Sequence, residues 1–69
     1  MLSIRDLIEQ FEIQGAYKVM SYSEETNDLT TVAEGYEIKP FKIEDKYLDA
    51  EITYMYADDN TLIIEINDD

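Results

Sequence analysis

The sequence predicts a small α+β protein in which one N-terminal helix packs on a four-stranded, mostly antiparallel sheet built from two hairpins. Three observations lead to this fold class. Apolar residues near the N-terminus recur with helical spacing, four later segments are rich in β-branched and aromatic residues, and polar connectors separate those segments in pairs. With 69 residues, of which 45% are hydrophobic, the chain is expected to form one small acidic domain over residues 1–69.

The helix is expected to begin just after Ser3. Ser3 and Asp6 have the Ser-x-x-acid spacing of an N-cap, in which the serine oxygen accepts a hydrogen bond from a free backbone N–H of the first turn. The apolar side chains that follow are spaced i, i+3, i+4, i+7 and would form one stripe: Ile4, Leu7, Ile8 and Phe11. Gly15 is placed to help end the helix. Because so short a helix is marginal alone in water, its stripe is expected to pack on the sheet.

The strands follow from runs of β-branched and aromatic residues. In chain order, the expected strands are residues 16–23, 29–34, 51–56 and 61–66. The polar connectors 24–28 and 57–60 contain Asp and Asn, which tolerate turn conformations, so each is expected to close a hairpin. Between the hairpins, Pro40 interrupts any central strand, and residues 43–48 are expected to form a single helical turn.

Alternation along the second hairpin predicts which side chains face the helix. One face collects six side chains: Ile52, Tyr54, Tyr56, Leu62, Ile64 and Ile66. The other face is mostly polar, with Met55 and Ile63 as its two apolar exceptions. Two explanations for this pair stay open. Either the connector 35–50, with Phe41 and Leu48, folds over it, or it forms a partner contact or a homodimer seam.

The six tyrosines allow two interpretations. A tyrosine in a sheet often buries its ring and keeps its hydroxyl in water, whereas a tyrosine at an interface anchors a partner. Burial is the expectation for Tyr54. Both interpretations stay open for Tyr22, Tyr36 and Tyr47.

Catalysis lacks its usual residues in this chain. There is no His to act as a base near neutral pH, no Cys nucleophile and no glycine-rich phosphate loop. A pair of carboxylates of the glycosidase type would need a cleft, for which so small a domain has little room. Residues 44–45 and 58–60 are rich in oxygen ligands but lack the pattern of a calcium loop. The sequence therefore predicts no enzyme activity, no cofactor and no metal site.

Net charge is the strongest functional signal. Seventeen acidic residues face only five basic ones, so the formal charge at pH 7 is −12. Such a surface repels nucleic acid and anionic membranes and attracts basic protein surfaces. No apolar run near the N-terminus has the length of a signal peptide or a membrane span, and cysteine is absent, so the protein is expected to be cytoplasmic.

Exposed carboxylates are therefore the candidate partner-binding residues. Those expected to lie on the helix, in the turns and in the connector are Glu9, Glu12, Glu24, Glu25, Asp28, Glu44, Asp45, Asp58 and Asp59. Under one hypothesis they mimic nucleic acid and block the basic surface of a host protein that handles nucleic acid. Under the alternative, the chain is a general protein-interaction module or a small homodimer. It would then assemble through a sheet edge or through Met55 and Ile63, and its acidity would serve solubility.

A resemblance bears on the choice of partner. The segments LSIRDLI at 2–8, ITYMYA at 52–57 and LIIEI at 62–66 resemble the small acidic accessory proteins carried by phages and mobile elements of anaerobic Gram-positive bacteria. The resemblance covers both ends of the chain but not its middle, and it carries no catalytic motif. It implies a role directed at the host, such as inhibition of a CRISPR effector or of a restriction enzyme.

Overall fold

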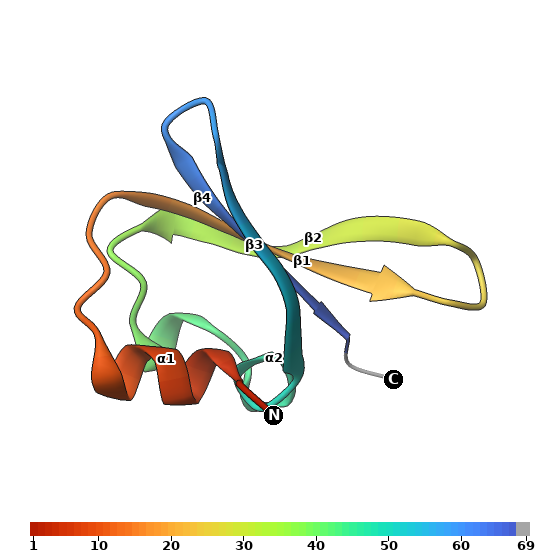
Figure 1. The fold of residues 1–69 in the computed structure, drawn as a ribbon, viewed down its shortest axis with the longest axis horizontal. Coiled ribbons are helices and arrows are strands. Elements are labelled where there is room, and N and C mark those ends of the chain that lie inside the picture. The colour runs from red at the N-terminus through yellow and green to blue at the C-terminus, as the bar shows by residue number, and fades with distance from the viewer. Residues whose placement is uncertain (68–69) are drawn as a thin grey trace.

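The fold is α+β, with an N-terminal helix and a four-stranded mixed sheet (Figure 1). The structure is a computed structural model and describes residues 1–67. Its elements, in chain order, are α1 Ile4–Gln10, β1 Ala16–Ser23, β2 Asp28–Tyr36, the 3-10 helix η1 Pro40–Lys42, α2 Asp45–Leu48, β3 Glu51–Asp58 and β4 Thr61–Asn67. Within residues 1–67 no helix has the length and apolar composition needed to cross a membrane.

The sheet has the strand order β2-β1-β4-β3. β1 pairs antiparallel with β2, and β3 pairs antiparallel with β4, whereas the central pair of β1 and β4 is parallel. The predicted, mostly antiparallel sheet is therefore present, and its parallel pair lies at the centre. β2 and β3 form the two edges. The chain between them, residues 37–50, passes from one edge to the other and carries η1 and α2.

The start of α1 is as predicted, but its end is not. The Ser3 hydroxyl accepts a hydrogen bond from the Asp6 backbone N–H, and the Asp6 carboxylate accepts one from the Ser3 N–H, both at 3.2 Å. The helix ends at Gln10, because Phe11 already has extended backbone angles and a side chain that is 61% exposed. Gly15 instead provides a positive φ of 92° in the loop before β1, a conformation that glycine adopts easily.

The three helices of residues 1–67 lie on one face of the sheet (Figure 1). The buried core between these layers consists of Ile4, Leu7, Tyr17, Val19, Ile38, Ile43, Leu48, Ala50, Ile64 and Ile66. Leu48 belongs to this core at 1% exposure, while Phe41 is 83% exposed. The expectation that the connector 35–50 covers the other face through Phe41 and Leu48 is therefore wrong. The connector packs beside α1, since the apolar strand residues there need more cover than seven helical residues provide.

Arg5 and the segment before α1 tie the helix to the rest of the fold. Arg5 Nε donates to Asp49 Oδ1 at 2.7 Å, and Arg5 Nη2 lies 3.3 Å from Asp45 Oδ1. The hydrogen bond from Arg5 holds the pKa of the Asp49 carboxyl below its usual range. The backbone N–H of Ile52 also donates to the carbonyl of Leu2 at 2.8 Å, so the N-terminus covers the first part of the β3 edge.

A β-bulge in β3 changes the direction of the side chains that follow it. Ile52 pairs with Ile66 of β4, but the next pair is Tyr54 with Glu65, so Thr53 is an extra residue. Because side chains alternate between the faces of a strand, one extra residue moves every later side chain to the opposite face. Tyr54, expected to be buried, is therefore 66% exposed.

The bulge also separates Met55 from Ile63. Met55 pairs with the fully buried Ile64 on the helix side, whereas Ile63 pairs with Tyr56 on the face without helices. Met55 is 47% exposed, and Ile63 is 6% exposed. The prediction that these two residues share one face is wrong, because it assumed strict alternation along β3.

Candidate protein-interaction surface

The sheet face away from the helices, here called the open face, has no covering element within residues 1–67 (Figure 1). The strand register places two rows of side chains across it, one formed by Tyr56, Ile63, Lys18 and Glu34 and the next by Tyr54, Glu65, Met20 and Thr31. Tyr54 and Tyr56 are 66% and 43% exposed. The open face therefore presents aromatic rings and charged groups side by side.

Two polar contacts order this face. The Tyr56 hydroxyl donates a hydrogen bond to Glu65 Oε2 at 2.7 Å, and Lys18 Nζ lies 3.9 Å from Glu34 Oε2. The hydrogen bond to Glu65, together with burial and nearby acidic charge, raises the pKa of the Tyr56 hydroxyl. Glu65 is thus held in one orientation by a neighbour on the adjacent strand.

A shallow recess of about 380 Å³ opens on this face. The residues that line it come from three strands and the β1–β2 turn, and they are Tyr22, Glu24, Thr53, Tyr54, Glu65 and Asn67. The Tyr22 hydroxyl also forms a hydrogen bond with the Asn27 side chain in that turn. The recess combines aromatic rings with carboxylates, and no Lys or Arg lines it.

The nine acidic residues predicted to bind a partner are all exposed. They lie in four places, namely Glu9 and Glu12 at the end of α1, Glu24, Glu25 and Asp28 at the β1–β2 turn, Glu44 and Asp45 at the start of α2, and Asp58 and Asp59 at the β3–β4 turn. The structure brings together the members of each group but not the four groups.

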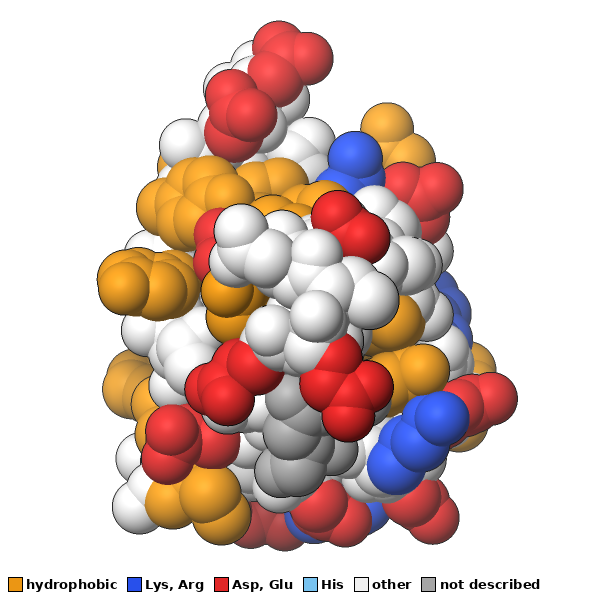
Figure 2. Space-filling view, turned by 90° about the vertical axis from the view of Figure 1, so that its right-hand side faces the viewer, with side chains coloured by type: hydrophobic (Ala, Val, Ile, Leu, Met, Phe, Trp, Pro, Cys, Tyr) orange, Lys and Arg blue, Asp and Glu red, His pale blue; other side chains and the backbone are white. Residues whose placement is uncertain are grey.

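Figure 2 shows this separation at the end of the molecule where the β1–β2 turn projects. Acidic side chains form a group at the top, where Figure 1 places the β3–β4 turn, and further groups around the lower half. Hydrophobic side chains lie between them on the left of the view. Of the nine candidates, Asp45 pairs with Arg5, and the others make no ion pair with a Lys or Arg of residues 1–67.

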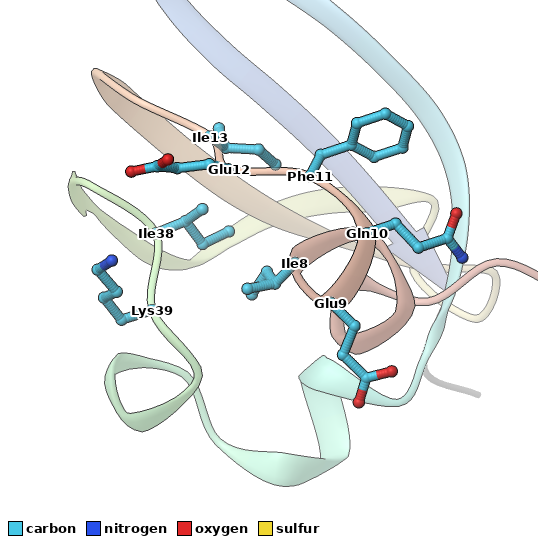
Figure 3. Close-up of a pocket in the computed structure, with 8 residues that line it drawn as sticks. All are labelled: Ile8, Glu9, Gln10, Phe11, Glu12, Ile13, Ile38 and Lys39. Atoms are coloured by element: carbon cyan, nitrogen blue, oxygen red, sulfur yellow. The ribbon is translucent and has the colours of Figure 1, made fainter.

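A second hollow lies at the end of α1 (Figure 3). Ile8 and Ile38 point into the space between α1 and the segment after β2, whereas Gln10 and Phe11 point away from it. Glu9, Glu12 and Lys39 are on its rim, along with Ile13. The apolar side chains here continue the core, and the charged groups are exposed, so the hollow offers no evident chemistry.

Metal-ligating side chains do not gather at one place in the described part of the chain. Within residues 1–67, no group of three or more His, Cys, Asp or Glu side chains is placed to hold a metal ion. The fold and its surface define a small acidic α+β protein with an open, tyrosine-bearing sheet face. Comparisons with protein-family models, with curated proteins and with solved structures found no match.

Sequence reasoning left the role of Tyr22 open and missed Tyr54, Tyr56 and Glu65 as members of a candidate site. The count of six tyrosines was the available signal, but the face of Tyr54 and Tyr56 depends on a bulge that alternation does not reveal. Glu65 was placed correctly on the face opposite Ile64 and Ile66. Its role in a recess depends on residues from two other strands.

Proposed function

We propose that this protein is a non-enzymatic acidic binding protein that covers a basic, nucleic-acid-handling surface of a host protein. The observation that carries the proposal is the negative charge at the β1–β2 turn and the β3–β4 turn. Five exposed carboxylates project there without an ion pair to a Lys or Arg of residues 1–67, and they are Glu24, Glu25, Asp28, Asp58 and Asp59. Unneutralised carboxylates at the tips of a rigid sheet attract cationic groups of a partner.

The dimensions suit a groove that normally holds nucleic acid. The molecule extends over 33 × 25 × 18 Å. The resemblance to phage and mobile-element accessory proteins favours a host defence enzyme, of the CRISPR effector or restriction type, as the partner. A cytoplasmic location goes with that role.

The test is competition between this protein and nucleic acid. Tagged protein would be used to capture partners from nuclease-treated lysate at low salt, and the captured complex would then be challenged with duplex DNA, with RNA and with rising salt. Groove mimicry predicts that nucleic acid displaces the protein and that affinity falls steeply with salt. A partner that stays bound through both challenges would contradict the proposal.

Charge-reversal variants test whether partner binding depends on the carboxylates at the turns. Glu25→Lys at the β1–β2 turn is expected to weaken binding more than Glu37→Lys, which changes the net charge equally at an exposed position outside the proposed groups. The difference would be greatest at low salt, because screening removes interactions between exposed charges. Equal effects from the two variants would show that the turns have no special part.

The exposed rings favour a second candidate function, a protein-interaction module that uses the open face. Tyr54, Tyr56 and Leu29 are 66%, 43% and 39% exposed on that face, and tyrosine is enriched at interfaces. An interface of this kind would depend on Tyr54 and be nearly indifferent to salt. A homodimer would instead bring together two copies of charge −12, so its dissociation constant should fall as salt rises, as sedimentation would show.

A further inference from the structure

The recess on the open face has the geometry of a site for a flat cation. Tyr54 is on β3, Tyr22 is on β1, and β4 runs between them with Glu65. β1 and β3 are two strand spacings of about 4.8 Å apart, and the register sets Tyr22 two residues, about 7 Å, further along than Met20, which is in the row of Tyr54 and Glu65, so the two tyrosine positions are about 12 Å apart. A cation held between the two rings would then lie within the distance of about 6 Å at which an aromatic face attracts positive charge.

The charges of the recess also select a cation. Glu65 lies between the rings, half-buried, and its Oε2 is fixed by the Tyr56 hydroxyl. Glu24 is at the rim and exposed, and the lining contains no basic residue to neutralise either carboxylate. An anion would be repelled here, and a purely apolar group would leave both carboxylates without a counter-charge. The described residues also offer no set of metal ligands at this place.

Arginine fits this combination better than lysine. Its planar guanidinium stacks on aromatic rings and donates several hydrogen bonds to a carboxylate, whereas the lysine ammonium is compact and strongly hydrated. A second copy of this chain cannot supply the arginine easily. Its one arginine, Arg5, already bonds to Asp49 and Asp45.

The geometry points to an arginine side chain of the partner protein, inserted between Tyr22 and Tyr54 and bonded to Glu65. This inference rests on the proposed function, for which it provides a specific anchor. The carboxylates at the turns attract the basic surface from a distance, and the recess then fixes one residue of it. The open face thereby becomes the side on which the partner docks.

The experiment uses two small probes that differ only in charge. The protein, labelled with ¹⁵N, would be titrated with N-acetyl-arginine amide and with the matching citrulline amide, which has the same shape and no charge. Arginine amide is expected to shift the amide resonances of recess residues, above all Thr53, Tyr54 and Glu65. The citrulline probe is expected to produce much smaller shifts at the same positions.

Matched variants assign the contacts. Glu65→Gln should weaken arginine binding roughly five- to tenfold, because a charged hydrogen-bond partner becomes neutral while the shape is kept. Glu37→Gln removes an equal charge at an exposed position outside the recess and should leave the affinity unchanged. Tyr54→Phe keeps the ring and should bind, whereas Tyr54→Leu should not. Thermal unfolding of each variant confirms that it is folded.

Several results would overturn the inference. These are equal shifts with citrulline, equal losses in Glu65→Gln and Glu37→Gln, or arginine shifts that spread over all acidic groups. If they occur while nucleic acid still displaces the protein from its partner, the recess is not the anchor but the proposed function stands. If arginine binds in the recess but nucleic acid does not displace the protein from any captured partner, the proposed function fails. The recess then remains an arginine site.

Discussion

The two faces of one sheet have different compositions and, we infer, different roles. On the helix side, Val19, Ile64 and Ile66 are fully buried. On the open face of the same sheet, Tyr54 and Tyr56 remain exposed next to Glu65. Burial of apolar area supplies most of the stability of a small domain, whereas exposed rings and charges contribute little to it. Stability and binding should therefore respond to different substitutions.

The largest expected effect is on the helix side. Ile64→Ala removes a fully buried side chain at the centre of the sheet and should lower the free energy of unfolding by about 2–5 kcal/mol. A domain of this size has only about 5 kcal/mol or little more to lose, so the variant would be close to unfolding at room temperature. Urea denaturation followed by circular dichroism measures the change.

The matched change on the open face is Tyr54→Leu. Because Tyr54 is 66% exposed, the free energy of unfolding should change by no more than about 0.5 kcal/mol. The same variant is expected to lose arginine binding. If it destabilises the fold as strongly as Ile64→Ala does, the two faces do not divide their roles as argued.

The helix cap gives an intermediate effect. Ser3→Ala leaves the Asp6 N–H without its acceptor and should cost about 0.5–2 kcal/mol of stability. Ser3→Thr keeps the oxygen and should recover most of the loss. If Ser3→Thr recovers the full stability and both variants bind arginine as the unchanged protein does, the cap acts on the helix side alone. Stability unchanged in Ser3→Ala would contradict a structural role for the cap.

Salt should act in opposite directions on folding and on partner binding. Raising the salt concentration from about 0.01 M to about 0.1 M shortens the Debye length from about 30 to about 10 Å. With a net charge of −12, the folded state suffers self-repulsion, so its midpoint of thermal unfolding should rise slightly. Partner binding through the turns should weaken over the same range. A midpoint that falls with salt would contradict the dominance of self-repulsion.

Local signals predicted much of the fold. The Ser3 and Asp6 spacing located the start of α1, and β-branched runs located the four strands within a few residues. These features depend on nearest neighbours in the chain. The β1–β4 pairing and the packing of residues 37–50 beside α1 depend on contacts between distant segments, for which a single sequence has no periodic signal.

The candidate site also has one part that neighbouring residues predict and another that depends on contacts between distant segments. The acidic turns follow from Asp, Glu and Asn in the connectors, and Asp59 and Asn60 do adopt the positive φ values expected of a tight turn. The recess was not predictable, because Thr53 forms a bulge that reverses the later part of β3. The local pattern around Thr53 does not distinguish a bulge from regular alternation. The sequence therefore could not predict which face of the sheet carries Tyr54.

The smallest expected effect is on the stability at high pH, where one tyrosine from each face can be compared. Burial raises the pKa of Tyr17 on the helix side, and the hydrogen bond to Glu65 raises the pKa of Tyr56 on the open face. For a phenol whose pKa is higher in the folded state, the stabilisation is fully present below the unfolded pKa of about 10 and is lost as pH rises through the folded pKa.

Stability should therefore decline above about pH 10, and Tyr17→Phe should remove more of that decline than Tyr56→Phe. The reason is that a charged phenolate on the buried side loses its hydration, whereas the Tyr56 hydroxyl stays near water. Urea unfolding between about pH 8 and 11 measures the slopes, with tyrosinate absorbance as the readout of ionisation. A larger effect from Tyr56 would mean that the open face is less accessible to water than its exposed rings indicate, and that the recess lies deeper in the fold.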